Sequence, residues 1–143
     1  MKLKFAVEAN SANLTKTVVK ARNFQIIIDE PKNLGGTDEG ANPVEYVLAA
    51  LAGCLNVVGH VVANEMNMPL NGLRIDLEGD LNPAKFTGKP TSERAGYQAI
   101  RVNITPDTTA DVETLDKWLE AIEERCPVSD NIQNPTPVEF TLG

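Results

Sequence analysis

The chain has 143 residues, of which 42% are hydrophobic and 23% are charged, a composition typical of a compact globular protein rather than a disordered one. Its 13 lysines and arginines against 20 aspartates and glutamates give a formal net charge of −7. This surplus of acid disfavours binding to nucleic acid or to an anionic membrane surface. We therefore expect a single domain over residues 1–143 with neither of these partners.

The first residues carry no apolar segment like that of a secretory signal. We expect a cytoplasmic protein, and in that compartment thiols are usually kept reduced. The chain has two cysteines, Cys54 and Cys126. A structural disulfide between them is therefore not assumed, and each cysteine needs another explanation.

Two N-terminal segments are rich in Val, Ile and Phe, residues 2–8 and residues 17–29. They predict two or three antiparallel strands, with a turn at residues 10–13. Residues 33–42 are dense in Gly, Asp and Asn, which predicts a loop that leads to a new element.

A long helix is predicted from Asn42-Pro43 to about Met66. Asn is a favoured N-cap, Pro is favoured at the first helical position, and Glu45 lies in the first turn, where the helix dipole favours a negative charge. The helix is apolar on all sides, which is typical of a buried central helix. Its longest apolar run, residues 46–55, is shorter than the ~20 residues of a membrane span.

The same helix carries small residues that let another backbone approach closely. A chain of this size has few elements of its own to surround such a helix, so we expect a homodimer. The small residues are Ala49, Ala52 and Gly53.

The second half of the chain predicts two strands and a helix. Apolar residues alternate over 73–77 and again over 100–104, so each segment predicts a strand with one buried face, and the polar residues 80–96 predict a long connection between them. An amphipathic helix is predicted from about Ala110 to Glu124.

The ends of that helix are marked by polar residues and by proline. Thr108 and Thr109 are candidate caps at its start, and Cys126-Pro127 is expected to end it. Residues 137–142 begin with Pro and predict a final edge strand.

The two cysteines lie in different settings. Cys54 is one turn from Leu51 and two from Val47, so its sulfur is expected on the packed side of an apolar helix. On position alone, Cys54 is explained most simply as a small buried hydrophobic residue. Cys126 lies at a helix end beside Arg125.

Two segments of the sequence change this interpretation. Residues 34–55 (LGGTDEGANPVEYVLAALAGCL) and 124–132 (ERCPVSDNI) resemble the OsmC/Ohr family of osmotically inducible and organic hydroperoxide resistance proteins. The resemblance implies an α+β, OsmC-like fold of antiparallel sheets with two central helices, in which two chains intertwine as a homodimer with active sites at the interface. It also implies thiol peroxidase activity that needs no metal, haem or other cofactor.

The resemblance assigns roles to both cysteines. Cys54 matches the peroxidatic cysteine and Cys126 the resolving cysteine of the family. A thiolate at Cys54 would reduce a small organic hydroperoxide and become a sulfenic acid, and Cys126 would condense with it to a disulfide. A dithiol reductant, such as the lipoyl type that the resemblance suggests, would then restore the thiols.

The resemblance also implies an arginine from the N-terminal strands, held by a glutamate directly after the Asn-Pro pair. Arg22 is the only arginine in those strands, with Lys16 and Lys20 nearby. Val44 occupies the family's glutamate position, and Glu45 follows it. Nine helical steps separate Glu45 from Cys54, which places the two about 180° apart around a straight helix. Arg22 and Glu45 are the candidate partners of Cys54.

Other functions remain open on the residues alone. His60, the only histidine, is six residues from Cys54 and lies on a different face of the helix. We therefore expect His60 to be a polar residue with its hydrogen bonds satisfied and not a catalytic base. No CxxC pair is present, and no metal site is expected. The alternative functions are a non-enzymatic OsmC-fold module that binds a hydrophobic ligand at the dimer interface, and a protein in which both cysteines are structural.

Overall fold

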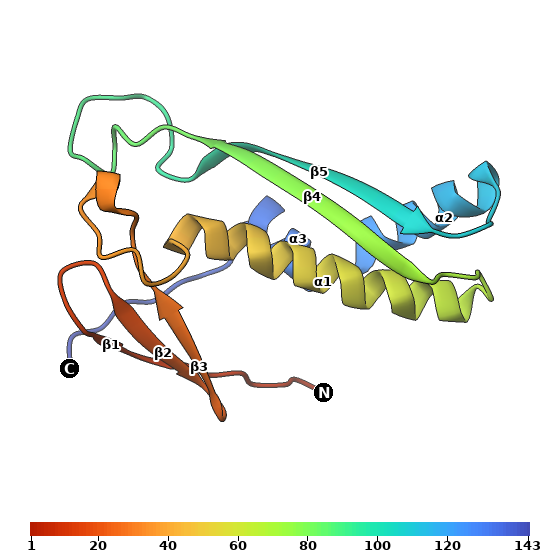
Figure 1. Ribbon diagram of the computed structural model, residues 1–143, viewed down its shortest axis with the longest axis horizontal. Helices are drawn as coiled ribbons and strands as arrows, with labels where there is room; N and C mark the ends of the chain where they lie inside the picture. The colour runs from red at the N-terminus through yellow and green to blue at the C-terminus, as the bar shows by residue number, and fades with distance from the viewer. The chain divides into compact units, whose positions relative to one another are not determined.

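The computed structural model describes all 143 residues and has an α+β architecture of antiparallel sheets and helices (Figure 1). The chain forms two compact units, Met1–Val47 and Leu48–Gly143. The first holds a three-stranded sheet. The second holds a two-stranded sheet and most of the helical residues.

The first unit is an antiparallel sheet in the order β1-β2-β3. Its strands are β1 (Glu8–Ser11), β2 (Thr17–Ala21) and β3 (Phe24–Ile28), and a short 3-10 helix, η1 (Lys32–Leu34), follows them. The chain reverses between β2 and β3 through Arg22, whose φ of 55° lies in the left-handed region. The predicted 17–29 segment is therefore two strands.

The position of β1 corrects the prediction. A strand was expected over residues 2–8 and a turn over residues 10–13, but β1 runs through Ser11. The reason is register: Glu8 pairs with Lys20, and β2 ends one residue later at Ala21, so earlier residues have no partner on β2. The turn forms around Asn13, whose side-chain oxygen accepts the N–H groups of Thr15 (2.9 Å) and Lys16 (2.7 Å).

A buried carboxylate organises the loop that follows β3. Asp29 is fully buried and accepts hydrogen bonds from the Thr15 hydroxyl (2.7 Å), the Thr37 hydroxyl, and the backbone N–H groups of Glu30 (2.7 Å) and Glu39 (3.2 Å). These donors outweigh the burial that would raise the pKa, so the pKa of Asp29 lies well below its usual range. One side chain thus ties the β1–β2 turn to the loop before α1.

The long helix, α1 (Pro43–Glu65), begins where Asn42-Pro43 predicted. Asn42 and Glu45 form a reciprocal capping box: the Asn42 side chain accepts the Glu45 N–H (2.8 Å), and the Glu45 carboxylate accepts the Asn42 N–H (2.9 Å). In the first turn, the Tyr46 hydroxyl also donates to the Ile27 carbonyl (2.7 Å).

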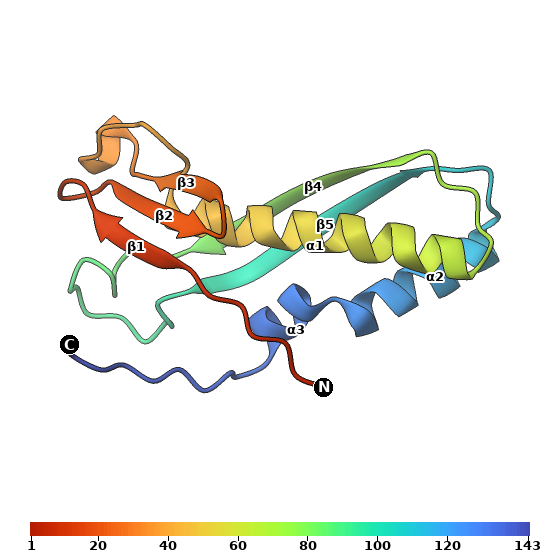
Figure 2. The same cartoon turned by 90° about the horizontal axis from the view of Figure 1, so that it is seen from below.

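In the second unit, β4 (Gly72–Leu81) and β5 (Tyr97–Asp107) form an antiparallel ribbon that runs along α1, as the alternating apolar residues predicted (Figures 1 and 2). The helices α2 (Val112–Arg125) and α3 (Pro127–Gln133) follow. The ribbon's apolar face packs on the helices through Leu73, Ile75 and Leu77 of β4. Its other face is polar and exposed.

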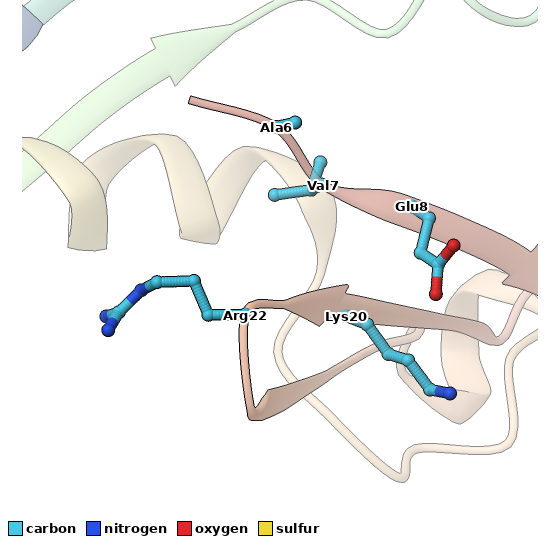
Figure 3. Close-up of a pocket in the computed structure, with 5 residues that line it drawn as sticks. All are labelled: Ala6, Val7, Glu8, Lys20 and Arg22. Atoms are coloured by element: carbon cyan, nitrogen blue, oxygen red, sulfur yellow. The ribbon is translucent and has the colours of Figure 1, made fainter. Parts of the chain in front are cut away.

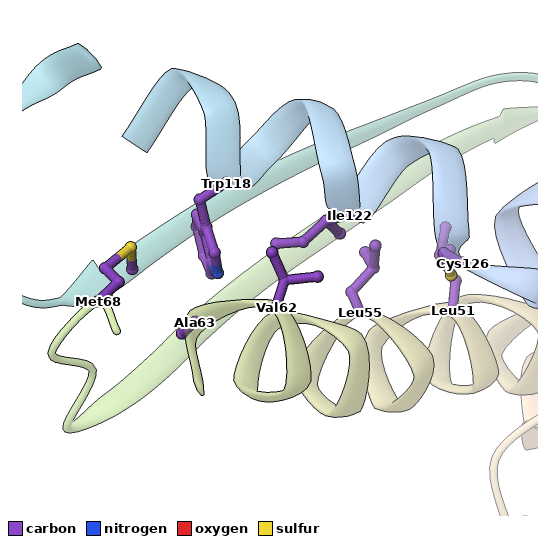
Figure 4. Close-up of a cluster of buried hydrophobic side chains, with 8 residues drawn as sticks. All are labelled: Leu51, Leu55, Val62, Ala63, Met68, Trp118, Ile122 and Cys126. Carbon is purple, nitrogen blue, oxygen red and sulfur yellow. The ribbon is translucent and has the colours of Figure 1, made fainter. Parts of the chain in front are cut away.

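The buried core of this unit lies between α1 and α2 (Figure 4). Apolar side chains from the two helices alternate along their contact, and the buried thiol of Cys126 lies at one end of the row. The fully or nearly fully buried residues are Leu51, Leu55, Val62, Ala63, Met68, Trp118, Ile122 and Cys126.

Three details of the C-terminal half differ from the predictions. The N-cap of α2 is Asp111, which accepts the Thr114 N–H (2.9 Å), because the Thr108 hydroxyl is used by Pro69 and Ala110. Helix α3 was not predicted. Residues 137–142 form no strand, because they pair with neither sheet of this chain.

By length and composition alone, α1 is apolar enough to cross a membrane. This is weak evidence for a membrane span, since the core helix of a globular protein passes the same test. One face of α1 is already occupied by the buried contact with α2.

We predict that Asp29→Asn destabilises the protein, because the amide NH₂ would face donors where the carboxylate now accepts. The thermal unfolding midpoint at pH 7 should fall by more than about 5 °C. Asp29 has a lowered pKa, so its stabilising effect exists above the unfolded value near 3.9 and is lost as the pH falls below it. Stability measured from pH 7 to 2 should therefore drop less in the variant. Equal midpoints at pH 7 would contradict this role.

Candidate active site

The two cysteines meet in the second unit although 72 positions separate them in sequence. Their Sγ atoms are 3.1 Å apart, with the Cys126 thiol donating to Cys54, and both are free thiols. A disulfide bond measures about 2.05 Å. A movement of about 1 Å would therefore be enough to bond the two sulfurs.

Helix α1 presents Cys54 at the border between its buried and exposed stripes. Leu51 and Leu55 are each 5% exposed, whereas Ala50, Gly53 and Val57 are exposed. Cys54 itself is partly buried and packs against the core cluster. Its thiol thus faces an apolar wall on one side and lies near the protomer surface on the other.

The Cys-Pro pair fixes the second thiol at the junction of two helices. Cys126 follows the last residue of α2 and is also the N-cap of α3, where its sulfur accepts the Ser129 N–H (3.4 Å). Pro127 ends α2, as predicted, and occupies the first position of α3, where its missing N–H costs nothing. Cys126 is 0% exposed.

The pKa of the Cys54 thiol is raised, chiefly because burial disfavours the thiolate. The backbone N–H of Val128 opposes this by donating to the Cys54 sulfur, whereas negative charge on the neighbouring Cys126 sulfur would repel the Cys54 thiolate and raises the pKa further. The first backbone donors of α3 are therefore directed at the two sulfurs, Val128 at Cys54 and Ser129 at Cys126. The signal that could have predicted α3 is an N-cap residue, Cys126, followed by Pro127 at the first helical position.

Close packing of α2 on α1 sets the distance between the sulfurs. A side chain at Gly59 would require its neighbours to shift, because a Cβ atom would lie 2.9 Å from the end of the Leu73 side chain and 3.2 Å from the Trp118 ring. The Trp118 indole N–H donates to the Gly59 carbonyl (2.8 Å). Beyond this contact the Arg125 guanidinium forms two hydrogen bonds with the Glu65 carboxylate (2.6 and 3.0 Å), an exposed pair that holds the pKa of Glu65 below its usual range.

Arg22, the candidate cation, belongs to the first unit, and its pairing with Cys54 stays a prediction. It lies at the β2–β3 turn with its guanidinium 5.0 Å from the centre of the Phe24 ring. Together with Ala6, Val7, Glu8 and Lys20 it lines a shallow groove of about 390 Å³ (Figure 3).

The remaining polar candidates have local roles in the structure. Glu45 caps α1, and a catalytic role for it stays a prediction. Lys16 pairs with Glu39 (3.2 Å). The His60 Nδ1 atom bonds the Asn56 carbonyl (2.9 Å) on the exposed side of α1. No group of three or more His, Cys, Asp or Glu side chains lies close enough together to hold a metal ion.

Comparison with known proteins identifies the family. The family model described as "OsmC-like protein" matches residues 36–141. The chain belongs to the OsmC-like family. This OsmC-like protein is 26% identical over 124 residues to the uncharacterized protein YmaD of Bacillus subtilis strain 168, a match that covers 85% of this chain and 80% of YmaD.

Two solved structures share the fold. The OsmC-like protein of Mycoplasma pneumoniae superposes with a TM-score of 0.81 at 21% identity, over 93% of this chain and 89% of its own. A Legionella pneumophila protein described as an organic hydroperoxide resistance protein OsmC superposes with a TM-score of 0.69 at 19% identity, over 92% and 90% of the two chains. The predicted α+β, OsmC-like fold is thus confirmed.

We predict that oxidation of the reduced protein with diamide stabilises it. A disulfide that closes a loop of 72 residues lowers the entropy of the unfolded chain, which raises the free energy of unfolding by about 4 kcal/mol. The thermal midpoint should rise by roughly 10 °C. Cys54→Ser and Cys126→Ser should each abolish the rise. A wild-type midpoint unchanged by diamide, with both thiols still titratable, would contradict the geometry.

Proposed function

We propose that this OsmC-like protein reduces organic hydroperoxides, with Cys54 as the attacking thiol and Cys126 as the resolving thiol. The observation that carries the proposal is the 3.1 Å separation of their Sγ atoms. Membership of a family with relatives described as organic hydroperoxide resistance proteins supports the same reaction.

In the proposed reaction the Cys54 thiolate attacks the outer oxygen of the hydroperoxide. The O–O bond breaks, the sulfur becomes a sulfenic acid, and the alkoxide takes a proton to leave as an alcohol. The Cys126 sulfur then attacks the sulfenic sulfur, forming the disulfide and releasing water. A dithiol reductant, for example of the lipoyl type, returns both cysteines to thiols and is itself oxidised to a disulfide.

The surroundings of Cys54 favour an organic substrate over hydrogen peroxide. The thiol packs against a cluster of aliphatic side chains, and an alkyl group gains by leaving water for such a wall. The chemistry takes place on sulfur and needs no metal or organic cofactor. We propose that it operates in the cytoplasm, where a reducing dithiol can regenerate the thiols.

We predict that the wild-type protein consumes cumene hydroperoxide continuously in the presence of dihydrolipoamide, and hydrogen peroxide more slowly. Cys54→Ser should reduce consumption to the rate without protein. Without dihydrolipoamide, Cys126→Ser should consume about one equivalent per protomer as Cys54 becomes a sulfenic acid. If wild type and Cys54→Ser consume the hydroperoxide at the same rate, the peroxidase proposal fails. In that case, a thermal midpoint that rises with a hydrophobic ligand in both Cys54→Ser and Cys126→Ser would favour the alternative function, a non-enzymatic module that binds such a ligand.

We further propose that Arg22 is the cation that stabilises the Cys54 thiolate, with Glu45 as its partner. Burial raises the pKa of Cys54, and an opposite charge close by would lower it. Arg22 has no carboxylate among its described contacts, only the Phe24 ring. Glu45→Gln would test the partner, because the glutamine can still accept the Asn42 N–H that caps α1.

We predict that Arg22→Met raises the apparent pKa of Cys54 by about one unit or more, as expected for the loss of a nearby opposite charge. The pH dependence of iodoacetamide alkylation in the Cys126→Ser background measures it, since Cys54 is then the sole thiol. Lys20→Met, a matched change on the same groove, should leave it unchanged. Identical profiles for Arg22→Met and its parent would exclude Arg22 as the activating cation.

We propose that residues 1–143 act as one OsmC-like domain that assembles into an intertwined homodimer. The outer stripe of α1 leaves Val57 61% and Val61 44% exposed beside the open surface at Gly53. In two further segments apolar and polar residues alternate as they do in strands, but neither segment pairs with a strand of this chain. Their exposed apolar residues, which a second copy would cover, are Leu3, Phe5 and Val7, and Val138, Phe140 and Leu142.

We predict that sedimentation at about 50 μM gives the mass of a dimer and that Val57→Glu shifts it toward the monomer. A buried carboxylate without a partner strongly disfavours association. Val112→Glu is the matched control: Val112 is 73% exposed at the start of α2, where a negative charge is tolerated. A monomeric wild type would contradict the assembly.

A further inference from the structure

The two sulfurs of the site differ in access from solvent. Cys126 is 0% exposed, whereas Cys54 is only partly buried. A second copy can cover more of a protomer but cannot uncover Cys126. We propose that the external thiol that reduces the Cys54–Cys126 disulfide attacks the Cys54 sulfur, so that Cys126 is the leaving group. This inference rests on the disulfide of the proposed function.

The geometry of thiol–disulfide exchange supports the choice. The attacking thiolate approaches a disulfide sulfur from the side opposite to the sulfur that leaves. The Cys126 sulfur lies on the buried side of Cys54. At about 100° per residue, Ala50, Gly53 and Val57 lie on the other side of Cys54 along α1, and all three are exposed. Within one protomer, the required approach is therefore from the exposed side of Cys54.

The Cys126 sulfur, which would be the leaving group, also has a hydrogen-bond donor that can stabilise its thiolate. The Ser129 N–H donates to Cys126 (3.4 Å), and a thiolate developing on that sulfur would accept the same bond more strongly. In-line attack on Cys126, by contrast, would have to pass through the core packing of α2 and α3.

One thiolate of the dithiol bonds to the Cys54 sulfur, the S–S bond breaks, and Cys126 takes the electron pair and then a proton. The second thiol of the reductant attacks its own bound sulfur, closes the reductant's disulfide and releases the Cys54 thiolate. Two electrons pass from the dithiol to the protein.

The test forms the disulfide with diamide, so that it depends on no hydroperoxide. Excess glutathione, a monothiol, is then added. The reaction is quenched with acid after short times, free thiols are blocked with N-ethylmaleimide, and the adducts are mapped by mass spectrometry. We expect glutathione on Cys54 and maleimide on Cys126 at least tenfold more often than the reverse.

A majority of adducts on Cys126 would overturn the inference and leave the proposed function intact. A disulfide that forms with diamide but not with cumene hydroperoxide would contradict the proposed function alone. No disulfide with either oxidant would overturn both.

Discussion

The close contact of α2 with α1 at Gly59 is the constraint on which the site depends. The missing side chain lets the Trp118 ring and Leu73 approach the backbone of α1, and the indole N–H binds the Gly59 carbonyl. From that contact α2 runs on by two turns to Cys126, while α1 runs back to Cys54. Two thiols far apart in sequence are placed within a small movement of bonding because the helices are held at this distance.

The same packing sets the electrostatics of the thiols. In the proposed reaction, an apolar wall suits an alkyl substrate but disfavours the attacking thiolate, so hydrogen-bond donors have to compensate. Helix α3 supplies Val128 to Cys54 and Ser129 to Cys126 through its backbone. These donors do not depend on side-chain identity. They are available even though Val44 occupies the position where the family resemblance implies a glutamate.

The sequence predicted those elements whose signals are local. The Asn42-Pro43 start of α1, the alternation in β4 and β5, and the Cys126-Pro127 end of α2 each depend on neighbouring residues, and the structure confirms them. The start of β1 was missed because it depends on where β2 ends. Residues 137–142 have a strand pattern without a partner strand in this chain, and a pattern alone cannot supply one.

The site itself was only partly predictable. Cys54 and Cys126 were singled out through the family resemblance, since no spacing rule brings together two residues from different helices. The roles of Gly59, Val128 and Ser129 involve backbone atoms or the lack of a side chain, so residue type gave no sign of them. Asp29, which organises the first unit, was missed because one acidic residue at a strand end has no distinctive pattern.

The most direct measurement adds one equivalent of cumene hydroperoxide to the reduced protein and maps its peptides without reductant. We expect an intact mass lower by two hydrogens and one linked peptide pair joining Cys54 to Cys126. Both thiols free, or Cys54 oxidised to a sulfinic acid while Cys126 stays a thiol, would contradict it.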